Sequence, residues 1–259
     1  MTFVAAAGLP FLARFYQIAK GFDVAILSFF NRFSQHSWYF DRLVVFVDGN
    51  NIIKSGIIVA LLWWQWFSKQ EDEEKKRAVR EQILLTILVA FVGIIVARFL
   101  AFALPFRVRP VEDAAIQFIQ PFNLEKHTYW NWSAFPSDHA VMFFAFAWSL
   151  RYISKKLGWF VFGYVTLFIC LPRLYLGVHY PTDLIVGMLI GVGMAWFAHL
   201  APIRKFLGKL FIQPSMRWLE RSPGTFYPCF FLLTYQIADM FDQIRSMGGF
   251  AYSFLKHLF

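Results

Sequence analysis

Long apolar runs separated by charged segments divide the chain and predict a polytopic membrane protein. A helix needs about 20 mainly apolar residues to cross a bilayer. The predicted spans are residues 52–67, 83–104, 136–153, 157–171 and 181–200, with 225–240 as a sixth candidate. Segments 1–50 and 202–223 mix apolar and polar positions, which is typical of amphipathic helices in the membrane interface. The pattern predicts an all-α transmembrane bundle of five to six spans with N-terminal interfacial amphipathic helices.

Composition supports this class. Hydrophobic residues make up 58% of the 259 residues, more than a soluble core of this length needs. We expect one membrane-embedded domain over 1–259, with an amphipathic part at 1–50, a helical core at 52–200 and a C-terminal part at 202–259. The first residues lack a basic stretch, so we expect no cleaved signal peptide. Both cysteines lie inside apolar runs, so we expect no disulfide framework or cysteine metal site.

The basic residues predict the orientation of the chain. Three charged segments, 69–80, 151–156 and 204–209, are predicted to be solvated loops on one side of the membrane, and they hold 11 of the 25 Lys and Arg residues. Positively charged loops mark the cytoplasmic side. The net charge of +9 therefore records topology, and we expect no nucleic-acid partner. Residues 107–135 and 173–183 then open on the outer face.

Arg173, His179 and Asp183 place ionisable side chains between two long apolar runs. Ionisable residues at membrane depth are costly and mark functional sites by default. His179 and Asp183 are four residues apart, so a helix would put them on one face, where the carboxylate would orient the imidazole. Arg173 offers a planar cation that can bind a phosphate through two parallel hydrogen bonds. Taken alone, the triplet fits a buried ion pair at a helix end equally well.

Two upstream segments add to this chemistry. A proline precedes Ser137, Asp138 and His139 at the start of an apolar run, which predicts a helix N-terminus that favours an anion. Arg107 and Arg109 lie at the outer end of the second predicted span. Each segment alone also fits an ordinary N-cap or arginines that reach lipid headgroups. Together the three segments supply guanidiniums, two histidines, a carboxylate and a helix start on one face, which suits a phosphoryl group.

The order of these motifs resembles the type 2 phosphatidic acid phosphatase superfamily. That family carries Lys-x6-Arg-Pro, Pro-Ser-Gly-His and Ser-Arg-x5-His-x3-Asp. This chain carries Arg-Pro at 109–110, Pro-Ser-Asp-His at 136–139 and Arg-x5-His-x3-Asp at 173–183. The motifs cover about residues 98–183, and the helical frame extends the likeness over most of the chain. The resemblance implies a membrane lipid phosphatase that needs no metal or other cofactor.

The resemblance also implies a role for each matching residue. His179 would be the nucleophile that forms a phosphohistidine, and Asp183 would orient it. His139 would protonate the leaving group and later activate water. The phosphate oxygens would be held by Arg109, Arg173, Ser137 and the backbone N–H of Asp138.

Phe102 stands where the family has its lysine, so that cation must come from elsewhere. Arg98 lies eleven residues before Arg109, close to three helical turns, so it could present a cation on the same face. Arg107 and Lys126 are competing substitutes, and the sequence does not choose between them.

Two further departures concern the phosphate site. Asp138 replaces the family glycine, and this form resembles undecaprenyl-pyrophosphate phosphatases of the bacitracin-resistance type. Its carboxylate would repel a phosphate unless it turned outward to cap the helix. Pro172 replaces the family serine and removes a hydroxyl and an N–H beside Arg173. The Asp138 form favours a polyprenyl pyrophosphate as substrate.

These features predict an integral membrane enzyme that hydrolyses undecaprenyl pyrophosphate at the outer leaflet through a phosphohistidine. The resemblance places it in a bacterial inner membrane, with its site facing the periplasm. The alternatives are a phosphatidate or phosphatidylglycerophosphate phosphatase, a lipid phosphotransferase, and a non-catalytic lipid-phosphate binder or transporter. The lipid substrate is the one partner expected, and no sequence feature assigns an oligomeric state.

Overall fold

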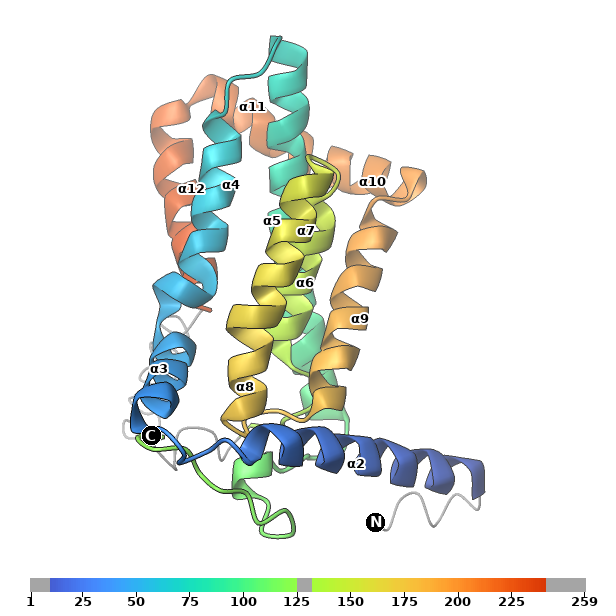
Figure 1. Cartoon of the computed structure of the whole chain (residues 1–259). Coiled ribbons are helices and arrows are strands. Elements are labelled where there is room, and N and C mark those ends of the chain that lie inside the picture. Colours follow the sequence, from blue (N-terminus) through green and yellow to red (C-terminus); the bar gives the residue numbers. More distant parts are fainter. Residues whose placement is uncertain (1–9, 125–131, 241–259) are drawn as a thin grey trace, which may run out of the picture.

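A computed structural model describes residues 10–124 and 132–240 of the chain. In these residues all regular secondary structure is helical, which confirms the predicted all-α class. The candidate site is held by a bundle of α5 (Glu73–Ala103), α6 (Asp138–Leu150), α7 (Lys155–Val165) with η3 (Thr166–Cys170) and α8 (Leu171–Tyr175), and α9 (Pro181–Ala198). Figure 1 shows these helices upright and side by side, with α7, η3 and α8 forming one continuous helix.

The central helix of this bundle is α6, which packs against α5, α7 and α9 and is buried along most of its length. Two glycines of α9 allow a close approach. A Cβ at Gly187 would lie 2.7 Å from the Ser137 carbonyl oxygen, and one at Gly191 would lie 2.2 Å from that of Val141. This Gly-xxx-Gly pair brings the starts of the two helices together. As a result, Ser137 N donates a hydrogen bond to the Asp183 carbonyl at 3.2 Å.

Within the described residues, three helices are long and apolar enough to cross a membrane: α5, Lys155–Tyr175 and α9. A fourth span results if α3 (Trp38–Gly49) and Ile52–Phe67, which are bent by 60°, count as one. Ile52–Phe67 comprises η1 (Ile52–Gly56) and α4 (Ile57–Phe67). The predicted five to six spans are not confirmed, because α6 has 13 residues and α12 (Pro223–Ala238) has 16, fewer than a typical span. The first predicted span is thus the second half of a bent pair.

The N-terminal helix α2 (Pro10–Asn31) lies across the end of the bundle where α6 and α9 begin (Figure 1). Its Asp23 is buried, whereas Ile18, Phe22 and Phe29 remain exposed. An amphipathic helix crosswise to the spanning helices fits an interfacial position, which stays a prediction. The short helix η2 (Pro110–Glu112) belongs to the segment that follows α5.

At the opposite end, α10 (Ala201–Leu207), η4 (Gly208–Ile212) and α11 (Gln213–Arg221) run crosswise, and α12 returns beside α4 (Figure 1). The predicted loop at 69–80 is wrong for residues 73–80, which form the first turns of α5. The Asp72 side chain accepts a hydrogen bond from Lys75 N at 2.6 Å and caps the helix. An ion pair of 3.1 Å between Arg77 and Glu81 links successive turns.

Candidate active site

The three motifs meet at the end of the bundle where α6 and α9 begin and α8 ends. One guanidinium lies between two histidines: Arg173 Nη2 is 2.9 Å from His139 Nε2, and Arg173 Nη1 is 3.5 Å from His179 Nε2. The Ser137 hydroxyl lies 3.3 Å from the same His179 nitrogen. Residues from two distant motifs therefore form one polar cluster.

His179 lies in the turn between α8 and α9 and is 2% exposed. Its Nδ1 is 2.9 Å from the Ala134 carbonyl oxygen. Because a carbonyl oxygen only accepts, Nδ1 carries the proton and donates it, and the lone pair of Nε2 points toward Ser137 and Arg173. Burial lowers the pKa of His179 well below its ordinary value, and the Arg109 and Arg173 cations lower it further. The ring is therefore neutral, with a free lone pair on Nε2, and its role as nucleophile stays a prediction.

The expectation that His179 and Asp183 share a helix face is wrong. Helix α9 begins at Pro181, so His179 precedes it and only Asp183 lies in its first turn. The Asp183 Oδ2 atom is 3.6 Å from His179 Nδ1, which is longer than a normal hydrogen bond. The orienting role of Asp183 therefore stays a prediction.

A second cluster anchors Asp183. Its Oδ2 accepts a hydrogen bond from Tyr180 N at 2.8 Å, and its Oδ1 pairs with Arg107 Nη1 at 2.5 Å. The same guanidinium pairs with Asp23 of α2 at 2.5 Å and donates to Thr182 Oγ1 at 2.8 Å. Arg107, a predicted phosphate-binding residue, therefore contacts two carboxylates, and a phosphate contact for it stays a prediction.

Arg98 reaches the start of α6 from α5, on the same side as Arg109. Its guanidinium pairs with the Asp138 carboxylate and lies 4.6 Å over the Trp132 ring. The Asp138 Oδ1 atom accepts a hydrogen bond from His139 N at 2.8 Å and lies 2.9 Å from His139 Nδ1. Asp138 does not turn outward to cap the helix. Arg98 compensates its charge instead, and Asp138 orients the His139 ring.

Arg109 is buried beside the proposed nucleophile. Its Nη1 donates a hydrogen bond to the Val178 carbonyl at 2.9 Å, one residue before His179. Arg98, Arg109 and His179 line a cavity of about 20 Å³. Both cations therefore reach the place where the motifs predict phosphate, although phosphate binding itself stays a prediction.

The structure also describes the departures from the family pattern. Phe102 is 90% exposed, so the position of the family lysine faces away from the site. Lys126 lies outside the described residues. Pro172 is buried in the helix one residue before Arg173, whose guanidinium still reaches both histidines.

The motifs do not predict three charged residues that the structure brings to this region. Asp48 Oδ1 lies 3.3 Å from Arg173 Nε, Lys54 is buried in η1, and Asp23 holds Arg107. Ionisable residues inside apolar segments are the signal that could have identified them. We assigned residues 1–50 to the membrane interface, where charged side chains are solvated. For this reason the charges of Asp23 and Asp48 did not indicate a functional site.

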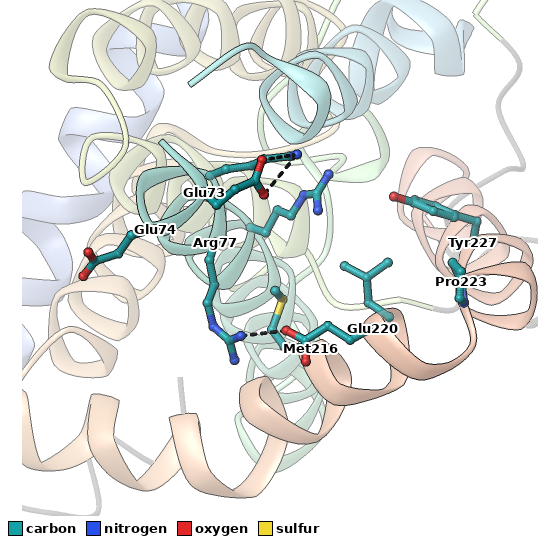
Figure 2. A pocket seen from close by; sticks show the side chains of 10 residues that line it. Glu73, Glu74, Arg77, Met216, Glu220, Pro223 and Tyr227 are labelled. Atoms are coloured by element: carbon teal, nitrogen blue, oxygen red, sulfur yellow. Dashed lines mark hydrogen bonds and ion pairs between the residues drawn. The ribbon is translucent and has the colours of Figure 1, made fainter. Parts of the chain in front are cut away.

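A cavity of about 610 Å³ is lined by residues of α5, α11 and α12 (Figure 2), which meet at the opposite end of the bundle (Figure 1). Arg77 and Glu220 form a 2.6 Å ion pair across it, between α5 and α11. Its charged lining is acidic and basic, with Glu73, Glu74 and Glu220 beside Lys76, Arg77 and Arg80. None of the described residues that line it is a histidine, so it lacks the chemistry of the motif cluster. Within 10–124 and 132–240, no group of three or more His, Cys, Asp or Glu residues could hold a metal ion.

Comparison with known proteins adds a family and one curated relative. The family model described as the PAP2 superfamily matches residues 80–206, a range that contains all three motifs. The bacitracin transport permease protein BcrC of Bacillus licheniformis is 34% identical over 79 residues, which are 30% of this chain and 38% of that protein. The chain therefore matches well under half the length of this relative.

Two solved structures are similar to the chain. The crystal structure of Aquifex aeolicus LpxE is 25% identical, covers 67% of this chain and 92% of that chain, and has a TM-score of 0.45. The first transmembrane PAP2 type phosphatidylglycerolphosphate phosphatase from Bacillus subtilis is 22% identical, covers 74% and 87%, and has a TM-score of 0.44.

Proposed function

We propose that this chain, a member of the PAP2 superfamily through residues 80–206, is an integral membrane phosphatase that hydrolyses a polyprenyl pyrophosphate such as undecaprenyl pyrophosphate. The observation that carries the proposal is the convergence of His139 and His179 on Arg173 beside a helix start. A phosphohistidine phosphatase needs such a nucleophile, proton donor and cation. The Asp138 form of the motif and the likeness to BcrC support the polyprenyl substrate.

In the first step, Arg109, Arg173 and Ser137 hold the terminal phosphate, together with N–H groups at the start of α6. His179 Nε2 attacks phosphorus, so the N–P bond forms as the bond from phosphorus to the bridging oxygen breaks. His139 gives a proton to that oxygen, and the lipid leaves as a monophosphate. In the second step, His139 takes a proton from water, which attacks the phosphohistidine, releases inorganic phosphate and restores His179.

In this mechanism, Asp183 stabilises the positive charge that develops on His179. A phosphorylated imidazole that keeps its Nδ1 proton is cationic, and the Asp183 carboxylate 3.6 Å away stabilises it. Arg107 pairs with that carboxylate, and Asp23 pairs with Arg107 and so holds the guanidinium in place. We therefore assign these two residues a positioning role.

Asp23→Asn tests this positioning role. The substitution keeps the shape of the side chain but weakens its hold on Arg107, so we expect kcat to fall on the order of 10-fold while KM stays nearly constant. Asp41→Asn is the matched control, because Asp41 is a buried carboxylate that accepts hydrogen bonds from Phe122 N at 2.9 Å and from the Tyr175 hydroxyl, and it contacts none of the proposed catalytic or phosphate-binding residues. Steady-state kinetics and thermal unfolding of both variants separate the effects. An equal fall of kcat in both would contradict the positioning role.

The lowered pKa of His179 predicts activity at acidic pH. The neutral ring is the nucleophile, so kcat/KM falls only when pH drops below this pKa. We expect the acid limb of the kcat/KM profile to lie below the ordinary histidine value of about 6.5. In Arg109→Gln the limb should move toward higher pH, because one cation that lowers the pKa is removed. Substrate ionisation is the same for both proteins, so an unchanged limb would contradict this assignment.

We place the site on the outer side of a bacterial inner membrane. The basic segments 151–156 and 204–209 lie at the end of the bundle opposite the motif cluster (Figure 1). Basic segments mark the cytoplasmic side, which puts the cluster at the outer leaflet. A substrate whose tail stays in lipid can then present its phosphates at the interface.

Phosphate release from undecaprenyl pyrophosphate by the purified protein in detergent with EDTA tests the proposed function. We expect release to persist in EDTA and to exceed that from phosphatidate. Faster release from phosphatidate would replace the polyprenyl substrate, and diversion of phosphate to an added alcohol would favour the phosphotransferase. No release from either lipid would contradict the enzyme and favour a lipid-phosphate binder.

A further inference from the structure

Lys54 is a buried cation near the motif cluster that the proposed mechanism does not yet use. It lies in η1, between α3 and α4, and is 8% exposed. In the described part of the chain its ammonium group forms no hydrogen bond or ion pair. Burying an ammonium group is costly unless an anion compensates its charge. The position therefore suits an anionic ligand.

The charges that surround Lys54 belong to the candidate site. Its charge interacts with those of Arg173, Asp48 and Asp138, and it also acts on His139. The helix before η1 contacts the site directly, because Asp48 of α3 lies 3.3 Å from Arg173 Nε, and Arg173 Nη2 lies 2.9 Å from Nε2 of His139, the proposed proton donor. These contacts place the segment that carries Lys54 beside the candidate site.

The neighbouring carboxylates have other partners. Their partners are Arg173 for Asp48 at 3.3 Å, Arg98 for Asp138, and Asn51 for Asp239 at 2.8 Å. Each of these three carboxylates therefore has a partner other than Lys54, and no ion pair with them compensates the charge of the Lys54 ammonium group.

The local backbone explains how a lysine of an apolar segment reaches the site. The 60° bend lies between α3 and the helix Ile52–Phe67, and the first turn of that helix is η1, a π-helical turn of the kind found frequently at functional sites. Hydrogen bonds hold this turn in place: Ser55 Oγ donates to the Ala238 carbonyl, and Tyr164 Oη donates to that of Ile53. These contacts hold the turn that carries the buried Lys54 in place.

We propose that Lys54 binds the phosphate of the leaving group and so selects a lipid pyrophosphate over a lipid monophosphate. This inference rests on the proposed function. When His179 attacks the terminal phosphorus, the bond to the bridging oxygen breaks, and His139 protonates that oxygen. A pyrophosphate leaves as a lipid monophosphate whose charge Lys54 compensates, whereas phosphatidate leaves as an uncharged hydroxyl. Lys54 therefore stabilises the departure of the lipid monophosphate, whereas the hydroxyl that leaves phosphatidate carries no phosphate for it to bind.

Lys54→Met and Lys54→Arg test the inference on both substrates. We expect Lys54→Met to lower kcat/KM for undecaprenyl pyrophosphate by about 100-fold and that for phosphatidate by less than about threefold. Lys54→Arg should recover most of the loss, because it restores a cation at that position. Lys20→Met is the matched control, because Lys20 is an exposed lysine of α2, and we expect it to change neither value.

Equal losses on both substrates, or no loss on either, would overturn the role of Lys54. A second measurement tests the Lys54 site without requiring catalysis: the shift in Tm of the protein when inorganic pyrophosphate binds. It can therefore fail or succeed independently of the proposed function. We expect pyrophosphate to stabilise the wild-type protein more than inorganic phosphate does, and Lys54→Met to lose that difference. If the wild type hydrolyses neither lipid but shows this Lys54-dependent binding, the proposed enzyme fails and the pyrophosphate site stands. An unchanged difference in Lys54→Met would overturn the site.

Discussion

Replacing His179 with asparagine is expected to lower phosphate release by about 10⁴-fold or more, because no atom then takes the place of the attacking Nε2. Asparagine can still donate a hydrogen bond to the Ala134 carbonyl, which His179 Nδ1 contacts at 2.9 Å. The turn between α8 and α9 should therefore keep its structure. The measurement is phosphate release from undecaprenyl pyrophosphate, together with thermal unfolding in detergent.

The matched control for this variant is His199→Asn. His199 stacks on Tyr152 with ring centroids 3.6 Å apart and lies at the opposite end of α9 from the motif cluster. We expect it to keep near wild-type activity. Retention of more than a few per cent of activity in His179→Asn would contradict the assignment of His179 as nucleophile.

Arg173 is the residue whose substitution is expected to have the second largest effect. Its two Nη atoms contact His139 and His179, and its Nε lies 3.3 Å from Asp48. Arg173→Lys keeps the charge, but a single ammonium group cannot replace the planar fork that faces both histidines. We expect kcat/KM to fall by about 100-fold in Arg173→Lys and by about 10³-fold in Arg173→Met. Arg173→Met should also lower Tm, because it leaves Asp48 buried without this partner.

Arg151→Lys serves as the control for the arginine substitution. The Arg151 guanidinium lies 4.1 Å over the Trp148 ring and 4.9 Å over the Trp159 ring, away from the motif cluster. Arg151→Lys therefore shows how replacing a planar guanidinium elsewhere in the bundle affects kcat/KM, which we expect to stay at the wild-type value. Wild-type kcat/KM in Arg173→Lys would show that the guanidinium does not bind the reacting phosphate.

The sequence predicts the spanning helices best where apolar length alone decides the outcome. α5, Lys155–Tyr175 and α9 pass that test, and each matches a predicted span closely. The bend before η1 is different, because the sequence places Asp48 in the segment 1–50 that we assigned to the interface. Its partner Arg173 comes from α8, more than 80 residues away, and no local pattern contains that contact.

In the candidate site, too, the sequence predicts some features and not others. The spacing and order of residue types in the motifs are enough to identify His139, His179 and Arg173 as site residues. They do not show that Ala134, rather than Asp183, accepts the hydrogen bond of His179 Nδ1, because α9 starts only at Pro181. The partners of side chains depend on where helices begin and how closely they pack, which here is decided by glycines of α9 against α6.

Trapping of the phosphoenzyme tests the central claim most directly. The protein is mixed with undecaprenyl pyrophosphate labelled in the terminal phosphate, quenched in alkali, digested and analysed for the labelled peptide. We expect an acid-labile, alkali-stable label on the peptide that contains His179. The label should accumulate in His139→Ala during slow turnover and be absent in His179→Asn. A label on another residue, or phosphate release without any label on His179 in either protein, would contradict the phosphohistidine mechanism.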